Sequence, residues 1–561
     1  MKKKNSKWPD RLIAGILMLA VAAFFAVPLA IYYLKDVRSI TPRDIDGAEK
    51  IFGLKFSRQE KKMMLPGLEE NRRHYASMRE VHLGNEIPPA FYFFPAWTET
   101  VTAPARKALD YSRPEKISVP ENKEDLAFMS VIELAELIRT GKITSLELTR
   151  IYLDRLKKFG PQLECTVTLT EELALNQARR ADEEIAAGRY RGPLHGIPWG
   201  AKDLLATRGI RTTWGSAIYK NQIPEENATV VDRLEAAGAV LVAKLSMGEL
   251  AMGDVWFGGR TRNPWNTRQG SSGSSAGSAA AVTAGLTGFA IGTETLGSIV
   301  SPSTRCGATG LRPTFGRVSR QGAMALSWTM DKIGPLCRTV EDCALVLEAI
   351  SGPDGRDPTV KDALFDWDPD SDLKSIRAGF LESAFEKKSR TQKFDLAVLE
   401  VLKKLGVQLS PVELPSCPVE SISFILDAEA AAAFDEVTRE NLDDLMVRQG
   451  RGAWPNIFRA ARFVPAVEYI QANRVRTMLE REMARTMENI DVFVTPSYGG
   501  NVLLVTNLTG HPAVVVPSGF DERGNPVSIT FIGRLYGEAE ALRLAKAYQD
   551  ASDHHLKHPK L

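Results

Sequence analysis

Residues 270–302, which read GSSGSSAGSAAAVTAGLTGFAIGTETLGSIVSP, decide the fold. A loop rich in serine and glycine leads into a small-residue helix, which is followed by a short apolar strand and a second glycine-flanked serine. A flexible linker has no reason to carry the alanine-rich run 279–284 or the apolar segment 288–292. A Walker-type phosphate loop would have a lysine after the glycines, and none follows here. This order of loop, helix, strand and loop predicts a catalytic surface with two hydroxyls, Ser274 and Ser298, on loops at either end of one compact unit.

Four motifs make the chain similar to the amidase signature family, the serine hydrolases that use a Ser–Ser–Lys triad. In chain order they read GIPWGAKD (196–203), GSSAGSAAAV (273–282), GTETLGSI (292–299), and GLRPTFGRVS (310–319) with MDKIGPLCRTVEDC after it. The resemblance extends from about Ala127 to His555. A chance match to one glycine motif is common, whereas four motifs in the right order are specific.

The resemblance implies the roles of the three triad residues. Ser298 is expected to be the nucleophile that forms an acyl-enzyme. Ser274, which in the family follows an unusual cis peptide bond, is expected to pass a proton between Ser298 and Lys202, and then to the leaving amine. The resemblance also implies an oxyanion hole and a role for one more serine. The hole is expected to consist of the backbone N–H groups of Thr295, Leu296, Gly297 and Ser298, and Ser275 is expected to bond within the substrate-binding site.

Lys202 follows an apolar, strand-like segment, and elementary electrostatics says how it could act as a base. Burial destabilises the ammonium and lowers the lysine pKa, which makes a neutral amine available. The alternative from this segment alone is a solvated lysine or one paired with Asp203. A histidine base is disfavoured because His195 and His511, the histidines inside the core, both lie in turn-like contexts. The chain also lacks a G-x-S-x-G nucleophile elbow.

Two departures from the family pattern lie beside the predicted nucleophile. The family commonly has Asp, a variable residue and two glycines before it, where this chain has Glu294-Thr295-Leu296-Gly297. A leucine side chain is compatible with an oxyanion hole if it points away, because only its N–H is needed. The family often has Arg two residues after the nucleophile, where this chain has Val300. These departures concern the substrate rather than the triad.

Composition sets broad limits. The 561 residues are 44% apolar and 25% charged, with a formal net charge of +2, which gives no case for nucleic-acid binding. The five cysteines are scattered and lack a CxxC pair, so neither a disulfide framework nor a zinc site is expected. We expect the cysteines to be small buried apolar side chains. No cofactor is predicted. The predicted partner is a small-molecule amide, and the oligomeric state is left open.

The N-terminus carries an apolar run. Residues 12–34 are 23 uncharged residues, long enough for a membrane-spanning helix, and basic residues precede them. They predict a single-pass membrane anchor with a cytoplasmic N-terminus and an extracytoplasmic catalytic domain. The alternative is a cleaved signal peptide with its site near Ala20-Val21-Ala22.

Alternating apolar runs and helical stretches predict an α/β fold with a central sheet covered by helices on both faces, preceded by one transmembrane helix. The resemblance implies in addition that this large sheet is mixed. The expected segments are a basic flank (1–11), the anchor (12–34), a juxtamembrane spacer (35–125) and an amidase domain (126–561) whose variable helical substrate cover spans about 419–489. Ser130 and Thr144 have capping-box spacing and should begin helices. Apolar runs at 239–243, 289–291 and 491–495 predict strands.

The sequence predicts an amidase that releases a carboxylic acid and ammonia or an amine. Three alternatives remain open: a lipid amidase similar to fatty acid amide hydrolase, the glutaminase subunit of a tRNA-dependent amidotransferase, and an inactive binding protein on the same scaffold. Retention of Lys202, Ser274 and Ser298 together argues against the inactive protein.

Overall fold

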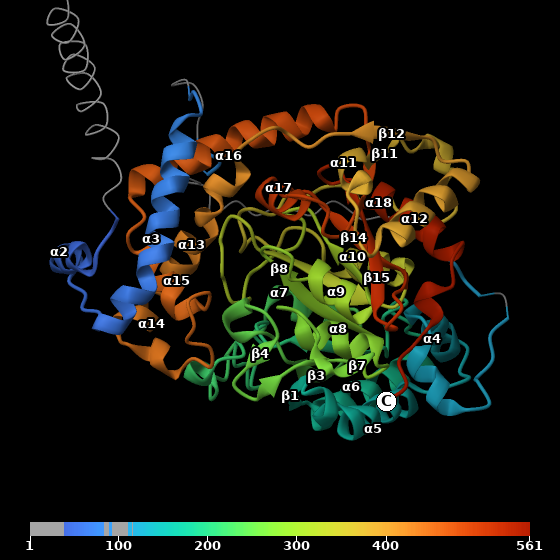
Figure 1. Cartoon of the computed structure of the whole chain (residues 1–561). Helices are drawn as coiled ribbons and strands as arrows, with labels where there is room; N and C mark the ends of the chain where they lie inside the picture. The colour runs from blue at the N-terminus through green and yellow to red at the C-terminus, as the bar shows by residue number, and fades with distance from the viewer. Residues whose placement is uncertain (1–38, 84–88, 92–109, 115) are drawn as a thin grey trace, which may run out of the picture. The chain divides into compact units, whose positions relative to one another are not determined.

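The structure is a computed structural model that describes residues 39–83, 89–91, 110–114 and 116–561 (Figure 1). The chain divides into two units, residues 1–73 and 74–561. The first unit contains α2 (Pro42–Phe52) and the greater part of α3 (Arg58–Arg79). Within it, Lys61 forms ion pairs with Asp46 and Glu49, which join the two helices.

An 11-stranded sheet runs through the second unit. Its strands lie in the order β1 (Thr166–Leu169), β3 (Val240–Leu245), β2 (Pro198–Lys202), β8 (Phe289–Glu294), β10 (Lys332–Cys337), β9 (Thr309–Arg312), β14 (Ala513–Phe520), β15 (Pro526–Gly533), β13 (Val492–Pro496), β11 (Ala378–Leu381) and β12 (Leu409–Val412). β2 is parallel to β3 and β8, whereas β10 is antiparallel to β8. The sheet is therefore mixed, as predicted. Two short hairpins, β4 (Val255–Trp256) with β5 (Gly259–Arg260) and β6 (Arg262–Asn263) with β7 (Asn266–Gly270), lie in the loop before residue 270.

Helices cover this sheet. Those before residue 310 are α4 (Val131–Arg139), α5 (Ser145–Leu163), α6 (Glu171–Ala186), α7 (Thr229–Ala236), α8 (Ala276–Thr283) and α9 (Val300–Cys306). Those after it are α10 (Val340–Ile350), α11 (Glu382–Glu386), α12 (Gln392–Lys404), α13 (Phe424–Ala433), α14 (Asp435–Arg439), α15 (Trp454–Ala461), α16 (Ala466–Thr486), α17 (Val502–Leu508) and α18 (Glu538–Asp550). Short 3₁₀ helices are η1 (Lys123–Phe128), η2 (Ala217–Tyr219), η3 (Glu249–Ala251), η4 (Leu373–Ser375), η5 (Val419–Ile422), η6 (Leu442–Leu445) and η7 (His554–Leu556).

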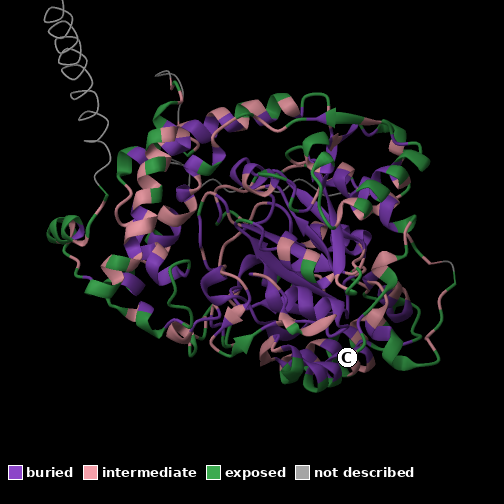
Figure 2. Ribbon diagram, viewed as in Figure 1, coloured by how far each residue is buried: buried purple, intermediate pink, exposed green. Residues whose placement is uncertain are grey.

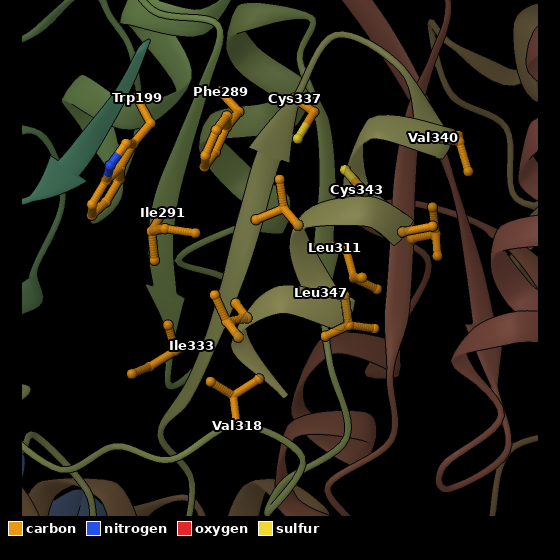
Figure 3. Close-up of a cluster of buried hydrophobic side chains, with 14 of the residues drawn as sticks. Trp199, Phe289, Ile291, Leu311, Val318, Ile333, Cys337, Val340, Cys343 and Leu347 are labelled. Carbon is orange, nitrogen blue, oxygen red and sulfur yellow. The ribbon is translucent and has the colours of Figure 1, made fainter. Parts of the chain in front are cut away.

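Strand side chains alternate between two apolar clusters, because successive residues of a strand point to opposite faces of the sheet. Phe289 and Ile291 of β8 join the cluster that includes α4, α7, α10 and α18, whereas Ala290 joins the cluster that includes α6 and α8. Figure 3 shows part of the first cluster, where Trp199 of β2 stacks on Phe289 with ring centroids 6.0 Å apart. The central strands, among them β2, β3, β8 and β10, are wholly buried (Figure 2), whereas the edge strands β1 and β12 are partly exposed. Burial on both faces holds the ends of β2 and β8 in fixed positions.

The predicted elements that can be compared are confirmed. Ser130 and Thr144 cap α4 and α5, and each side chain accepts a hydrogen bond from the backbone N–H three residues on. The three predicted strands correspond to β3, β8 and β13. All five cysteines are free thiols; four are buried and Cys417 is half-buried. The segment 419–489 is helical, from η5 to α16. Its role as a substrate cover and the other domain boundaries stay predictions.

One part of the predicted fold needs correction. The apolar run 12–34 lies outside the described residues. Among the residues that the structure does describe, no helix is both long enough and apolar enough to span a bilayer. The prediction of a fold that begins with a transmembrane helix is therefore wrong as an account of this structure. The membrane attachment and the extracytoplasmic location were inferred from that helix alone and are withdrawn with it.

Candidate active site

Lys202, the last residue of β2, is fully buried, and its amine lies among oxygen atoms. Its Nζ atom is 2.9 Å from Ser274 Oγ, 3.0 Å from Ser275 Oγ, 2.8 Å from Thr293 Oγ1 and 3.3 Å from the Thr293 carbonyl oxygen. Burial lowers the pKa of Lys202 to about 7, although the negative charges of Asp331 and Glu294 oppose the shift. A large fraction of this amine is consequently uncharged at neutral pH.

The partners of the amine determine which side of it can exchange a proton. The Ser275 hydroxyl donates to the Thr293 carbonyl at 3.0 Å, so towards Lys202 its oxygen acts as an acceptor. Ser275 and Thr293 together accept two N–H bonds of Lys202. Lys202 Nζ is also within donating distance of Ser274 Oγ, at 2.9 Å. A neutral amine has two N–H groups and one lone pair, so with both N–H groups on Ser275 and Thr293 its lone pair would be left for the Ser274 hydroxyl.

Ser274 is fully buried on the loop before α8, and the Gly273–Ser274 peptide bond is cis, as the resemblance implied. The Ser274 carbonyl accepts from the Gly248 N–H at 3.3 Å. A Cβ atom on Gly273 would lie 1.8 Å from the carbonyl oxygen of Gly253, so this position requires glycine. Asp254 accepts from the Ser272 N–H at 3.1 Å. The segment 248–254 thereby contacts, from one side, the serine loop (residues 271–275).

Ser298 lies between β8 and α9 on a loop anchored by Glu294. One carboxylate oxygen of Glu294 accepts from the backbone N–H groups of Ile299 and Val300, at 2.8 and 2.9 Å. The other accepts from Arg312 at 2.7 Å and from Asn507 at 2.9 Å. Burial raises the pKa of Glu294, but the Arg312 charge and these hydrogen bonds outweigh it and bring the pKa to about 2. A permanent anion therefore fixes the turn that carries Ser298.

A direct bond joins the two serine loops, because the Ser275 N–H donates to the Ser298 carbonyl at 3.1 Å. On the other side, the Thr295 hydroxyl donates to Asp331 at 2.5 Å. Ser298 is 7% exposed, whereas Leu296 is 38% exposed. Within the described residues, the backbone N–H groups of Leu296, Gly297 and Ser298 donate to no other group. The loop thus presents free backbone donors beside a nearly buried hydroxyl.

Comparisons with known proteins agree with this geometry. The model of the Amidase family matches residues 147–502. The chain is 36% identical over 481 residues to a glutamyl-tRNA(Gln) amidotransferase component from Roseiflexus sp. (strain RS-1), a match that covers 77% of this chain and 98% of that protein. The chain belongs to the amidase family. It is an enzyme, a hydrolase that acts on carbon–nitrogen bonds.

Comparison with solved structures also identifies the fold as that of the amidase family. The peptide amidase from Stenotrophomonas maltophilia is 29% identical with a TM-score of 0.69, and the match covers 76% of this amidase and 97% of that chain. An amidase family protein from Bacillus anthracis is 28% identical with a TM-score of 0.70, covering 78% and 94% of the two chains. The predicted family membership is confirmed.

The structure brings all the predicted site residues of this amidase into one region. Lys202 contacts Ser274 and Ser275, and the loop 295–298 bonds to Ser275 through Ser298. Ser275 is fully buried, and its described hydrogen bonds are with Lys202 and Thr293. Its predicted contact with substrate stays a prediction. Val300, where the resemblance implied that an arginine is often found, is buried in the apolar cluster beside α16 and α17.

Sequence reasoning missed Thr293, which contributes two of the four contacts of the Lys202 amine. Its position in the motif GTETLGSI was a usable signal, because a hydroxyl at a strand end next to a buried lysine can satisfy an N–H bond. The two core histidines lie elsewhere. Arg191 N–H donates to His195 Nδ1, and the Thr509 hydroxyl contacts His511 Nδ1. Burial lowers the pKa of His511 to about 3, so this imidazole stays neutral.

A cavity of about 530 Å³ borders the site on the Thr293 and Thr295 side. Its walls are largely apolar and include Leu204, Ala251, Met324, Leu326 and Ile333, with the half-exposed Trp328 among the lining residues. The Arg320 guanidinium lines it too, paired with Asp357 at 3.0 Å. No group of three or more metal-binding side chains occurs in the described part of the chain.

Proposed function

We propose that this amidase hydrolyses a carboxamide through an acyl-enzyme on Ser298, with Ser274 as the proton relay and Lys202 as the base. The observation that carries the proposal is the buried Lys202 amine, whose pKa is about 7 and whose remaining position faces Ser274 Oγ at 2.9 Å. A base is most effective when its pKa lies near the working pH. The family match supports the same assignment.

In the first half-reaction, Ser298 Oγ attacks the amide carbonyl carbon. The Ser298 proton moves to Ser274 Oγ while the Ser274 proton moves to Lys202 Nζ. The tetrahedral intermediate collapses as Lys202 returns a proton through Ser274 to the leaving nitrogen, so ammonia or an amine departs and an ester to Ser298 remains. Water then attacks this ester through the same relay, which releases the carboxylic acid and restores Ser298.

The oxyanion of each tetrahedral intermediate requires donors that are already oriented. We assign this role to the backbone N–H groups of the loop 295–298. The support is that Leu296, Gly297 and Ser298 have no acceptor for these groups among the described residues, and that Glu294 fixes the loop. Removal of one such donor typically costs a factor of about 10²–10³ in kcat.

The test is covalent labelling. A fluorophosphonate should label the wild-type enzyme on Ser298, and Ser298→Ala should lose both the label and amide hydrolysis while keeping its circular dichroism spectrum. Ser301→Ala is the matched control, because Ser301 lies three residues further on and is half-buried. It should keep label and activity. Wild-type turnover by Ser298→Ala, or labelling of another serine in the wild type, would contradict the proposal.

A second candidate function is that of a glutaminase within a larger complex, as the names of the 36% identical relatives suggest. Those names describe one component of a glutamyl-tRNA(Gln) amidotransferase. An enzyme of this kind would release ammonia from glutamine and would depend on partner proteins. Ammonia release from glutamine and from simple aliphatic amides by the isolated chain separates the two functions. The proposed amidase acts on simple amides without a partner.

A further inference from the structure

The oxyanion loop, residues 295–298, begins at Thr295, whose side chain is held by a carboxylate distant in sequence. The Thr295 hydroxyl donates to Asp331 Oδ1 at 2.5 Å. The other oxygen of Asp331 accepts from the backbone N–H groups of Leu326 and Ser327, at 2.8 and 2.9 Å. Three donors thus occupy both oxygens of Asp331, an arrangement that suits an ionised carboxylate because that group only accepts.

The segment 326–331, to which Asp331 belongs, is bound in turn by Glu429 of α13. Glu429 is 4% exposed, and one of its oxygens accepts from the Ser327 hydroxyl at 2.6 Å and from the Thr329 N–H at 3.0 Å. Its other oxygen accepts from the Thr329 hydroxyl at 2.7 Å and from the Tyr469 hydroxyl of α16 at 2.8 Å. Four donors therefore fill the acceptor positions of this buried carboxylate.

Ser327 connects the two carboxylates directly. Its hydroxyl donates to Glu429, its N–H donates to Asp331, and its carbonyl accepts from the Asp331 N–H at 3.0 Å. Arg476 of α16 adds two bonds to the neighbouring Thr329, at 2.7 Å to the hydroxyl oxygen and 2.8 Å to the carbonyl oxygen. A continuous set of hydrogen bonds consequently runs from α13 and α16 through Ser327 and Asp331 to the oxyanion loop.

The oxyanion loop is fixed at each of its ends by a different carboxylate. Glu294 binds the two backbone N–H groups that follow Ser298, and Asp331 binds the side chain of Thr295. The N–H groups between these two contacts are the proposed donors to the oxyanion, and such donors are effective only when they are oriented before the reaction. Loss of the Asp331 contact would leave the Thr295 end of the loop without its side-chain bond.

We propose that Glu429 and Asp331 are positioning residues for the reaction: Glu429 fixes the segment 326–331, and Asp331 of that segment holds the Thr295 end of the oxyanion loop in place. The proposal rests on the function assigned to Ser298 above. It deepens that function, because the geometry of the active site then depends on hydrogen bonds to α13 and α16. Among the described residues, neither carboxylate bonds to a member of the triad, so both act through Thr295.

The first test measures transition-state stabilisation in Glu429→Ala, with the simple aliphatic amide that the wild type hydrolyses fastest. We expect kcat to fall about 100-fold with KM within about twofold, because a displacement of about 1 Å has that effect and oxyanion donors act in the transition state. A trifluoromethyl ketone with the same acyl chain forms a tetrahedral adduct on Ser298 and should bind more weakly by a similar factor. Tyr469→Phe, which removes one of the four donors to Glu429, should give a smaller loss of both.

Glu468→Ala is the matched control for Glu429→Ala. Glu468 is also a buried carboxylate of the helical segment 419–489, at 6% exposed, but it pairs with Arg79 instead of the segment 326–331. Its kcat and its affinity for the ketone should remain those of the wild type. Circular dichroism spectra of both variants establish that the comparison is made between folded proteins.

The second test uses Asp331→Asn and adds a readout that a purely structural role would not change. Burial lowers the pKa of Lys202, and the negative charges of Asp331 and Glu294 oppose that effect. Asparagine has a similar shape without the charge, so the midpoint of the kcat/KM profile should move to lower pH while kcat falls. Glu429→Ala should lower kcat with the midpoint unchanged, because Glu429 acts by position alone.

The outcomes separate the inference from the function on which it rests. Wild-type kcat in Glu429→Ala or Asp331→Asn would overturn the positioning roles, and so would a loss of kcat without weaker binding of the ketone. An equal loss in Glu468→Ala, or a midpoint that does not move in Asp331→Asn, would overturn them too. Hydrolysis through Ser298 would stand in all these cases. If no amide is hydrolysed, or if Ser298→Ala remains active, the proposed function fails and the inference fails with it.

Discussion

Arg312 and Glu294 form a fully buried ion pair, 2.7 Å apart, behind the loop that carries Ser298. The other contacts of Arg312 are also fixed, since its guanidinium donates to the His511 carbonyl and to the Thr506 hydroxyl. The pair thus joins β8, β9, α17 and the segment after α17. Through Glu294, which accepts from the backbone N–H groups of Ile299 and Val300, this charge network anchors the short loop 295–298.

Loss of one partner of this pair should be costly. Arg312→Met should destabilise the protein by about 3–5 kcal/mol, because the Glu294 carboxylate would remain buried without a counter-charge. Urea unfolding followed by tryptophan fluorescence measures the change. The control is Arg534→Met, which removes a pair of Arg534 with Glu540 at a site where Arg534 is 47% exposed. That change should be within about 1 kcal/mol. Equal effects from both variants would contradict a special role for the buried pair.

The pH dependence of kcat/KM should follow Lys202. Its pKa in the folded protein is lowered to about 7, so the active, uncharged amine forms as the pH rises through that value. Below it, kcat/KM should increase about tenfold per pH unit, and above it the profile should level off. Lys202→Ala should cost several orders of magnitude at every pH. A profile that is flat between pH 5 and 8 would argue for a different base.

The same pKa shift has a consequence for stability. The lysine is lowered from 10.5 to about 7 on folding, so between these values the unfolded chain binds more protons than the folded protein. Stability attributable to Lys202 therefore increases as the pH rises from about 7 to about 10. The difference in unfolding free energy between the wild type and Lys202→Met should shift in favour of the wild type over that range. A difference independent of pH would mean that the amine is not neutral in the folded state.

Ser275 should act through Lys202. Ser275→Ala removes an acceptor of one amine N–H and leaves the Thr293 N–H and carbonyl without this partner. We expect kcat to fall by about 10- to 100-fold and the apparent pKa of the profile to move, since a lost hydrogen bond to a charged group is worth about 1.5–3 kcal/mol. Ser278→Ala, which removes a buried bond to the Ile291 carbonyl from the same helix, is the control. Ser278→Ala should leave the apparent pKa of the kcat/KM profile unchanged.

Gly273 should not tolerate a side chain. Gly273→Ala would place a Cβ 1.8 Å from the Gly253 carbonyl oxygen, so the serine loop or the segment 248–254 must shift. Activity should fall by at least about 100-fold, because a displacement of about 1 Å at the reacting groups has that effect. Gly450→Ala, where an added Cβ meets no atom within 4 Å, should be neutral in both activity and thermal unfolding. Normal turnover by Gly273→Ala would exclude a tight contact there.

The sequence predicted the parts of this site that lie in local motifs. Lys202 and Ser274 are 72 residues apart, yet each stands in a recognisable motif, and the structure puts them in contact. Local patterns of apolar runs and helix caps also predicted a sheet covered by helices, whereas its mixed character was implied by the family resemblance. Thr293 as a partner of the amine, and Arg312 as the counter-charge of Glu294, were not predicted. Both depend on the register of β8 against its neighbours, which no local pattern specifies.

The membrane prediction failed for a different reason. Hydropathy of the run 12–34 reports only how favourably such residues would transfer into lipid. It carries no information on the fold of the remaining chain, whose described helices include no candidate span. The predicted location outside the cytoplasm depended on the predicted transmembrane helix, so both predictions rested on the same apolar run.

The four oxygen contacts of the Lys202 amine also bear on the path that a proton can take. With two N–H groups occupied by Ser275 and Thr293, and the side chain fully buried, the amine faces the reaction only through Ser274. In the proposed relay the amine takes the Ser274 proton while Ser274 takes the Ser298 proton, and the amine returns its proton to Ser274 as Ser274 protonates the departing nitrogen. Two protons move together in each step, one between the serines and one between Ser274 and the amine. Rates in mixtures of light and heavy water should accordingly depend on the deuterium fraction as a quadratic rather than a straight line.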